Sequence, residues 1–269
     1  MKRKWIVISL VVLIVGFLAS GFYNGLTVTK YIIHSDKITN QVRIVLITDL
    51  HSNMYGSGQS KLINRIIAQD PDIIALAGDI MDDVQPDSAA IEFLEGITDK
   101  YPCFYVTGNH EFWSGRVDEQ KDIFRSYGVV VLEGDRVDID INGQSLTILG
   151  VDDPAGFGFN EHLEEVGGAV DTDRYSILLS HRPERFETYA RYDFDLVLSG
   201  HAHGGQWRIP LLLPHGVFAP DQGFFPTYTV GIYESNGTKM LVSRGLALES
   251  TSWPRIFNPP ELVVIDLVP

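Results

Sequence analysis

Short apolar runs alternate with stretches of helical periodicity along most of the chain. Apolar residues at helical spacing predict helices over 62–67 and 91–97, and a third helical stretch, 118–127, ends at Gly128. Five apolar runs predict buried strands, at residues 42–48, 73–77, 104–107, 176–180 and 196–199. This alternation predicts an α/β domain built in layers.

A hairpin is predicted near the middle of the chain. Residues 137–141 and 145–149 have strand character, and Asn142-Gly143 between them suits a two-residue type I′ turn. We therefore expect antiparallel strands to be commoner in the second half of the domain. The chain shows no internal repeat and no low-complexity tract.

The first thirty residues differ from the rest. Lys2, Arg3 and Lys4 precede the 25 residues 5–29, which carry no charge and exceed the roughly 20 residues that a helix needs to cross a bilayer. We predict a single-pass membrane anchor over 1–30 and one domain over 31–269. Basic charge at the N-terminus predicts a domain held at the cell membrane on its extracytoplasmic side. The alternative is a cleaved signal peptide, with Ala19-Ser20-Gly21 as its cleavage site.

Composition narrows the class of protein. The 35 acidic and 21 basic residues give a formal net charge of −14, and the part after residue 30 keeps 17 basic residues and carries −18. This balance disfavours a nucleic-acid-binding surface and suits a protein that binds cations. The single cysteine, Cys103, excludes a disulfide framework and lies in an apolar run, which predicts a buried thiol. A hydrophobic content of 45% favours a packed core over disorder.

Every one of the five predicted strands is followed by Asp, Asn or His. Because open α/β sheets place ligand sites at the carboxyl ends of their strands, these residues predict one site. Carboxylate, amide and imidazole donors without a thiolate suit Mn²⁺, Fe or Zn²⁺. On extended segments, positions i and i+2 project to one side, so Asp49 with His51, and His201 with His203, are each expected to reach one site. The seven candidate ligands exceed one tetrahedral site and indicate two metal ions with a bridging carboxylate: Asp49, His51, Asp79, Asn109, His181, His201 and His203.

The ordered motifs resemble those of the calcineurin-like metallophosphoesterases. The segments are D-L-H, G-D-x-x-D, G-N-H-E, a lone S-H and G-H-A-H, between Asp49 and His203, and the tail through Glu261 is similar to that of membrane-anchored bacterial members. The resemblance implies a layered β-sandwich flanked by helices. It also implies one metal ion held by Asp49, His51, Asp79 and His203, and a second held by Asp79, Asn109, His181 and His201. Asp79 would bridge the two ions, and His110 would face the substrate as a catalytic residue.

The resemblance implies hydrolysis of a phosphate ester or pyrophosphate bond. Two divalent ions (Mn, Zn or Fe) roughly 3.5–4 Å apart would make hydroxide available near neutral pH, and His110 would stabilise or protonate the leaving oxygen. We expect Asp82 and Glu111 to hydrogen-bond the site or cap turns. The expected substrate is a phosphorylated small molecule or lipid, including lipid-linked and nucleotide-linked compounds such as UDP-diacylglucosamine. The other expected partner is the membrane, through the N-terminal helix.

Two other functions compete with this interpretation. One is a non-catalytic metal-binding scaffold with the same fold, although such a protein should have lost ligands or His110. The other is a metal-dependent nuclease, which the net charge of −18 disfavours because a polyanion would be repelled. Protein phosphatases of this superfamily follow their Gly-Asp segment with an arginine-glycine pair, whereas this chain continues with residues 80–84 and has none, which disfavours that substrate class.

Three further features have simple structural interpretations. Arg182 follows a candidate ligand and is predicted to be a surface arginine rather than a phosphate contact. Asp152-Asp153-Pro154 is predicted to form a strand-ending turn rather than to add carboxylates to the site. The apolar segments 209–214, with Phe218, and 224–226 are predicted to pack under a Pro-rich loop. The alternative for them is a hydrophobic wall near the site or a contact with the membrane.

Overall fold

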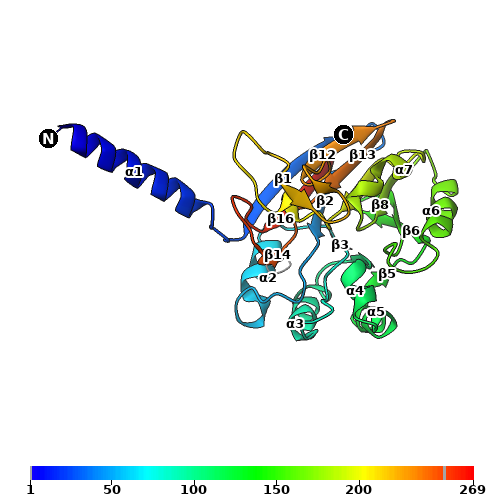
Figure 1. Cartoon of the computed structure of the whole chain (residues 1–269). Helices are drawn as coiled ribbons and strands as arrows, with labels where there is room; N and C mark the ends of the chain where they lie inside the picture. Colours follow the sequence, from blue (N-terminus) through cyan, green and yellow to red (C-terminus); the bar gives the residue numbers. More distant parts are fainter. Residues whose placement is uncertain (1, 251–252) are drawn as a thin grey trace.

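Two six-stranded β-sheets pack face to face and carry helices on their outer surfaces (Figure 1). The computed structural model describes residues 2–250 and 253–269. The first sheet has the order β1-β16-β2-β3-β4-β5, with β2 to β5 parallel and β16 antiparallel to β2. Its strands are β1 (Thr27–His34), β16 (Glu261–Val268), β2 (Val42–Ile47), β3 (Ile73–Ala77), β4 (Cys103–Val106) and β5 (Val130–Val131).

The second sheet is mixed, with its antiparallel pairs at the two edges. Its order is β12-β13-β9-β8-β7-β6, and the four inner strands run parallel. Antiparallel pairs are commoner in the second half of the domain, as predicted, but in this sheet they lie at the edges because helices and long loops connect the inner strands. The hairpin prediction is confirmed, with φ of 56° at Asn142 and 76° at Gly143. The strands are β12 (Gly231–Ser235), β13 (Thr238–Val242), β9 (Leu196–Ser199), β8 (Tyr175–Leu179), β7 (Gln144–Gly150) and β6 (Asp135–Ile141).

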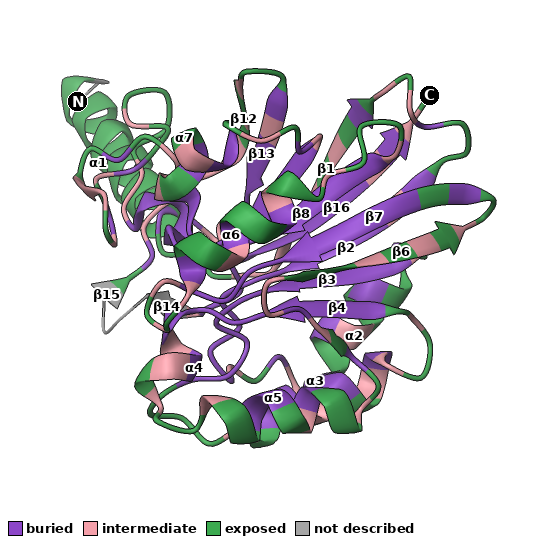
Figure 2. Cartoon of the chain, turned by 90° about the vertical axis from the view of Figure 1, so that its right-hand side faces the viewer, coloured by how far each residue is buried: buried purple, intermediate pink, exposed green. Residues whose placement is uncertain are grey.

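The alternation of side chains along the strands builds three apolar layers. On β2, Ile44 and Leu46 point into the core between the sheets, whereas Val45 and Ile47 point to the outer face. Helices cover that outer face, and others cover the outer face of the second sheet, so the inner strands of both sheets are buried on both sides (Figure 2). The covering helices are α2 (Ser60–Ile67), α3 (Ser88–Ile97) and α5 (Val117–Ser126) on one side, and α6 (Phe159–Gly168) and α7 (Phe186–Tyr189) on the other.

Short elements lie in the loops around this framework. The predicted strands and helices match observed ones to within two residues at most ends. The elements not predicted from the sequence are β1, β5, β12, β13 and β16 of the two sheets and the helices α4 (Asn109–Trp113), α6 and α7. The short elements are η1 (Ser57–Gln59), α4 (Asn109–Trp113), η2 (Pro183–Arg185), η3 (His203–Gly205), β10 (Phe218–Ala219), β11 (Gly223–Phe224), β14 (Glu249–Ser250) and β15 (Trp253–Pro254).

The N-terminal helix α1 (Lys2–Ser20) projects away from the sheets (Figure 1). Residues 3–20 are exposed along its whole length, and its 19 residues span about 28 Å, close to the hydrocarbon thickness of a bilayer. By length and composition it is a candidate membrane span. The boundary predicted at residue 30 falls inside β1, because Thr27–His34 pairs with β16 along its full length.

Candidate metal centre

The seven predicted ligands meet at one end of the two facing sheets. Those from the first sheet follow β2, β3 and β4, and those from the second follow β8 and β9, so the parallel strands deliver them to a common edge. All are buried, with at most 7% of each residue exposed. Burial of this many acid and imidazole groups is costly unless they bind one another or a cation.

The backbone at the site is held in left-handed conformations. Five of the seven residues have φ between 45° and 63°, a region that residues other than glycine seldom adopt: Asp49, His51, Asp79, His201 and His203. Such outliers concentrate at functional sites, where the surrounding structure maintains them. The expectation of extended D-L-H and H-A-H segments is therefore wrong, because both segments are tight turns.

Glycines allow the strand ends to approach so closely. A Cβ on Gly78, which has φ of +85°, would lie 2.5 Å from His181 Nδ1. A Cβ on Gly245, which has φ of +74°, would lie 2.6 Å from the Cβ of Asp49. The loop after β13 thus forms one wall of the site, and the sequence analysis did not identify it because the loop carries no chemical motif.

Asp79 lies between the histidines of the two sheets. Its Oδ1 accepts a hydrogen bond from the backbone N–H of His110 at 2.9 Å, whereas its Oδ2 lies 3.0 Å from His181 Nε2 and 3.6 Å from His51 Nε2. Burial raises the pKa of this carboxyl, but the neighbouring His181, His51 and His110 outweigh burial and hold the pKa well below its usual range. The same pairing raises the pKa of His181 to about 10 against the effect of burial.

Six buried ligand atoms at this centre have no hydrogen-bond partner. They belong to six of the seven predicted ligands: His51 Nε2, Asp79 Oδ2, Asn109 Oδ1, His181 Nε2, His201 Nδ1 and His203 Nδ1. Buried polar atoms are normally paired, so a cluster of unpartnered donor atoms fits metal ions as their missing partners. These residues therefore satisfy the chemistry of a divalent metal centre.

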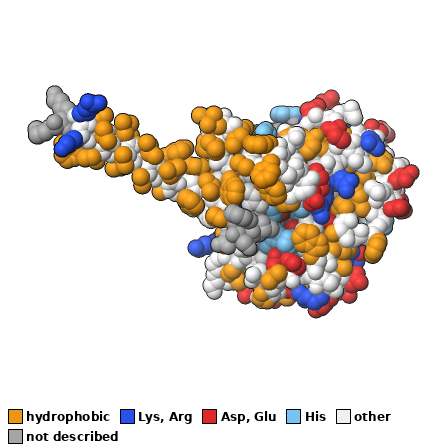
Figure 3. All heavy atoms as spheres, in the orientation of Figure 1, with side chains coloured by type: hydrophobic (Ala, Val, Ile, Leu, Met, Phe, Trp, Pro, Cys, Tyr) orange, Lys and Arg blue, Asp and Glu red, His pale blue; other side chains and the backbone are white. Residues whose placement is uncertain are grey.

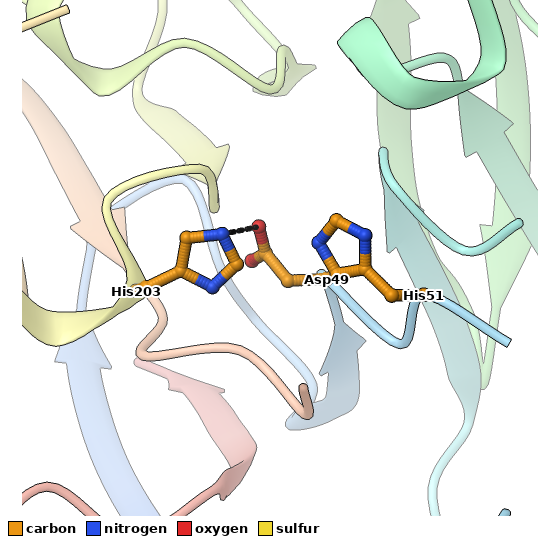
Figure 4. Close-up of side chains that lie close together, drawn as sticks. All are labelled: Asp49, His51 and His203. Carbon is orange, nitrogen blue, oxygen red and sulfur yellow. Dashed lines mark ion pairs between the residues drawn. The ribbon is translucent and has the colours of Figure 1, made fainter. Parts of the chain in front are cut away.

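The ligand atoms separate into two groups. Asp49, His51 and His203 form one group within 4.8 Å (Figure 4), and Asp79, His181 and His201 form the other. His203 Nε2 lies 3.8 Å from Asp49 Oδ1. The turn between His201 and His203 sends the two imidazoles to different groups of the same centre.

Two acidic residues support the ligands through hydrogen bonds. Both oxygens of the buried Glu111 accept bonds from backbone N–H groups at 2.8–3.0 Å, those of Gly108 and residues 79–81. Asp82 lies 3.1 Å from His51 Nδ1, which leaves His51 Nε2 free to bind a metal. Both arrangements agree with the expected roles in hydrogen bonding and turn capping.

His110 stands at the rim of the centre, in contact with acidic groups. Its Nδ1 lies 2.7 Å from Asp83 Oδ1 and 3.4 Å from Asp82 Oδ2. Burial lowers the pKa of His110, but the hydrogen bond with Asp82 and the charges of Asp79 and Asp83 outweigh it and raise the pKa to about 9. Asp83 is not among the residues predicted from the sequence, and the only signal for it is its position directly after Asp82 of the Gly-Asp segment.

A cavity opens in front of His110. Its volume is about 650 Å³, and His51 and His110 lie in its wall with Met54, Val84 and Leu248. The cavity therefore gives a molecule access to the centre from the side on which His110 lies. Its wall combines imidazoles and carboxylates with apolar side chains, which suits a ligand with both charged and apolar parts.

Arg182 is buried beneath the second group of ligands, so the prediction of a surface arginine is wrong. Its Nε lies 2.5 Å from Asp153 Oδ2, and Nη1 pairs with Asp221. Asp221 Oδ2 also lies 2.9 Å from His201 Nε2. The hydrogen bond with His201 and the charge of Arg182 lower the pKa of Asp221 despite its partial burial. Asp153 does form the predicted strand-ending turn, accepting from Ala155 N–H at 2.8 Å, and it also orients Arg182.

The apolar segments after η3 are exposed, so their predicted packing under a loop is wrong. Leu211 is 99% exposed, and Leu212, Phe224 and Phe225 are each at least 70% exposed. Phe224 belongs to the antiparallel pair β10–β11 and the other three residues flank it, and the two residues per strand of this pair leave no sheet face to cover them. Cys103, by contrast, is buried as predicted, and burial raises the pKa of its thiol to about 12.

Comparison with known proteins identifies the family. A family model described as calcineurin-like phosphoesterase matches residues 42–205. An uncharacterized metallophosphoesterase of Campylobacter jejuni is 31% identical over 271 residues, which cover 97% of this chain and 69% of that protein. An uncharacterized metallophosphoesterase of Aquifex aeolicus is 30% identical over 254 residues, which cover 90% of this chain and 92% of that protein.

A solved structure agrees at the level of the fold. NAD nucleotidase of Haemophilus influenzae aligns with a TM-score of 0.54 at 15% identity, covering 77% of this chain and 45% of that one. The fold, the ordered motifs and the relatives lead to the same conclusion. The chain belongs to the calcineurin-like phosphoesterase family, whose members are hydrolases of phosphate esters with dinuclear metal centres.

Proposed function

We propose that this chain hydrolyses a phosphate ester or pyrophosphate bond at a dinuclear metal centre, with His110 as the catalytic residue. The observation that carries the proposal is the convergence of unpartnered buried ligand atoms at the end of the two sheets. The proposed ligands of one ion are Asp49, His51, Asp79 and His203, and those of the other are Asp79, Asn109, His181 and His201. Asp79 is the proposed bridge because its free Oδ2 lies near both His51 and His181.

The residues of this chain prepare the centre for that chemistry. Two divalent ions, when bound, supply hydroxide near neutral pH and neutralise charge on the phosphoryl oxygens. Glu111 holds the turn that carries Asp79, and the backbone N–H of His110 fixes Asp79 Oδ1, so the free oxygen stays directed at the ligands. Asn, Asp and His ligands suit Mn²⁺, Zn²⁺ or Fe, and these ligand types do not favour one of the three metals over the others.

His110 is the proposed proton donor to the leaving oxygen. It lines the cavity and lies beside His51 and Asp79, and Asp82 and Asp83 favour its protonated form. A protonated imidazole can stabilise or protonate an oxygen that departs from phosphorus. Retention of this histidine and of all the ligands argues against the scaffold alternative.

The shape of the surface supports a phosphorylated lipid or lipid-linked nucleotide as substrate. The cavity at His110 adjoins a second cavity of about 650 Å³, and both are lined by Met54 and Leu248. The second cavity reaches residues 23–26, directly after α1, and Lys61 and Arg65 also line it. A substrate could place its phosphate at the metal centre, its apolar part along Met54 and Leu248, and a second anionic group near Lys61. UDP-diacylglucosamine has the phosphate and the apolar acyl chains of this combination.

The proposed location follows from α1. We infer a single-pass anchor because α1 is apolar, exposed and long enough to span a bilayer. The basic residues before the apolar stretch favour a cytoplasmic N-terminus and an extracytoplasmic domain. The net charge of the domain disfavours nucleic acid as the substrate.

Metal-dependent turnover by the purified full-length chain tests the proposal. We expect the chelator-treated protein to be inactive and to recover with two equivalents of Mn²⁺, Zn²⁺ or Fe²⁺ per chain. A chromogenic phosphomonoester, a phosphodiester and UDP-diacylglucosamine in mixed micelles distinguish the ester classes, and single-stranded DNA tests the nuclease alternative. Full metal loading without turnover of any of them would establish the scaffold.

A further inference from the structure

A loop of this domain exposes an unusual amount of apolar surface. Residues 209–225, here called the apolar loop, expose six large hydrophobic side chains, and hydrophobic atoms gather on the domain close to the point where α1 leaves it (Figure 3). Single exposed hydrophobic residues are ordinary, but a contiguous patch indicates a contact surface. The exposed side chains are Ile209 (42%), Leu211 (99%), Leu212 (75%), Phe218 (37%), Phe224 (72%) and Phe225 (70%).

Backbone hydrogen bonds connect the base of this loop to the end of α1. Arg208 N–H donates to Ile256 C=O at 2.9 Å, and the next residue, Phe257, donates its N–H to Gly21 C=O at 2.6 Å. The rings of Phe257 and Phe17 lie 4.9 Å apart. The loop therefore starts beside the C-terminal turn of α1.

The linker after α1 keeps this face near the membrane. Only residues 21–26 separate α1 from β1, so the chain from Ser20 to Thr27 can extend at most about 25 Å. If α1 spans a bilayer, the domain cannot move beyond that distance from its surface. The apolar loop then lies on the part of the domain closest to the lipid.

The charge distribution also fits a lipid surface. The chain has 35 acidic residues, yet none occurs in residues 1–35 and only Asp221 occurs in residues 204–230. The carboxylate of Asp221 pairs with Arg182 and lies 2.9 Å from His201 Nε2. The apolar loop therefore carries no unpaired negative charge into a bilayer interface, where such a charge would be costly to bury.

We propose that the apolar loop inserts into the interfacial region of the bilayer that holds α1, and so fixes the orientation of the metal centre toward lipid. The inference rests on the proposed anchoring by α1. Leu211, Leu212, Phe224 and Phe225 supply the apolar contact, and Pro210 and Pro214 restrict the backbone that presents it. Asp221, on the inner side of the same loop, links the membrane contact to His201.

Site-directed fluorescence quenching in vesicles tests this contact. The full-length chain, with Leu212→Cys labelled by an environment-sensitive fluorophore, is reconstituted in phosphatidylcholine–phosphatidylglycerol vesicles that contain nitroxide-labelled lipid. The native Cys103 is only 3% exposed, so a maleimide reaches the introduced cysteine selectively. Leu13→Cys in α1 is the positive control. Phe157→Cys is the matched exposed control, because Phe157 is fully exposed and precedes α6, on the side of the domain away from α1 (Figure 1).

We expect the Leu212 label to lose at least half of its fluorescence to shallow nitroxides while the Phe157 label stays unquenched. Quenching at Leu13 without quenching at Leu212 would overturn the loop contact and leave the anchor intact. No quenching at Leu13 would overturn the anchor and the loop contact together. A Leu212 label that is unquenched by lipid but protected in a cross-linked dimer would assign the loop to a second copy of this chain.

Activity gives a second readout from residues outside the catalytic machinery. Leu211→Ser combined with Leu212→Ser should leave turnover of a water-soluble phosphomonoester within twofold of the parent chain. The same variant should hydrolyse a vesicle-embedded phospholipid substrate at least fivefold more slowly. Equal rates of the variant and the parent chain on the vesicle substrate would contradict the proposal. If neither the variant nor the parent chain hydrolysed the water-soluble phosphomonoester, the proposed function itself would be contradicted.

Discussion

The two carboxylate oxygens of Asp79 have different surroundings. A substitution at this residue can therefore test metal binding at the site. Oδ1 is held by the backbone N–H of His110, and Oδ2 lies between His51 and His181 with no hydrogen-bond partner. An asparagine at position 79 can keep the hydrogen bond that Oδ1 accepts, and it loses only the negative charge at the position of Oδ2. The substitution to asparagine therefore separates folding from metal binding.

We predict that Asp79→Asn loses at least one metal ion and that its turnover falls on the order of 10²-fold or more, because the centre loses the charge that two cations share. Metal content by mass spectrometry and rates at saturating Mn²⁺ measure the two effects. Circular dichroism should show an unchanged fold. A fully metallated and active variant would refute the dinuclear assignment.

The matched control is His110→Ala. It should keep both metals while turnover falls, because the proposed role of His110 is to stabilise or protonate the leaving oxygen. The deficit should shrink for substrates with a very acidic leaving group, which needs little protonation. Equal metal loss in the two variants would assign His110 to the ligand shell.

Among the structural elements, β2 and β16 are joined by an ion pair whose contribution to stability depends on pH. Arg43 Nε donates to Asp266 Oδ1 at 2.6 Å and Nη2 donates to Oδ2 at 3.1 Å, between residues that are opposite each other in the two strands. The hydrogen bond with Arg43 holds the pKa of Asp266 below its usual range, against the effect of burial. A lowered pKa in the folded state stabilises the protein above the unfolded pKa of about 4, and this stabilisation is lost as the pH falls further.

Asp266→Asn should therefore lower the free energy of unfolding by about 1–2 kcal/mol at pH 7, and the difference from the parent chain should disappear as the pH falls below about 4. Denaturant unfolding of both proteins across this range measures it. Asp122→Asn is the control, since its pair with Arg125 is exposed and should change the free energy by under about 0.5 kcal/mol. A constant difference at all pH values would show that the charge of Asp266 does not stabilise the strand pair.

At the scale of the whole molecule, the proposed anchoring of the domain by α1 can be tested directly. We expect the full-length chain to stay in the membrane during alkaline carbonate extraction, while a fragment that begins at residue 24 is released. The fragment starts before Thr27 because β1 is part of the first sheet, and a start at residue 31 would remove half of that strand. Recovery of a mature N-terminus near Gly21 would establish cleavage in place of anchoring.

Local patterns were sufficient for much of the architecture. Continuous apolar runs, helical spacing and the Asn142-Gly143 turn predicted most of the strands and helices, because period and turn chemistry act over a few residues. The strand β1 was not predicted because its N-terminal part continues the uncharged stretch of the anchor. Only its pairing with β16 distinguishes it from that stretch. Apolar runs did not indicate that the four inner strands of the second sheet run parallel, because strand direction depends on connections that such runs do not encode.

By itself, the sequence determined which residue types follow the strands and in which order, and this was enough to name the candidate ligands and the family. Tertiary structure decided how those residues lie. Left-handed turns direct His201 and His203 to different ligand groups, and Asp153 and Asp221 draw Arg182 into the interior. In the part of the chain that the structure describes, no other segment covers the apolar loop, which lies beside α1. The physical reason is that burial and side-chain direction depend on contacts between distant segments, whereas a motif records only the order of residues along the chain.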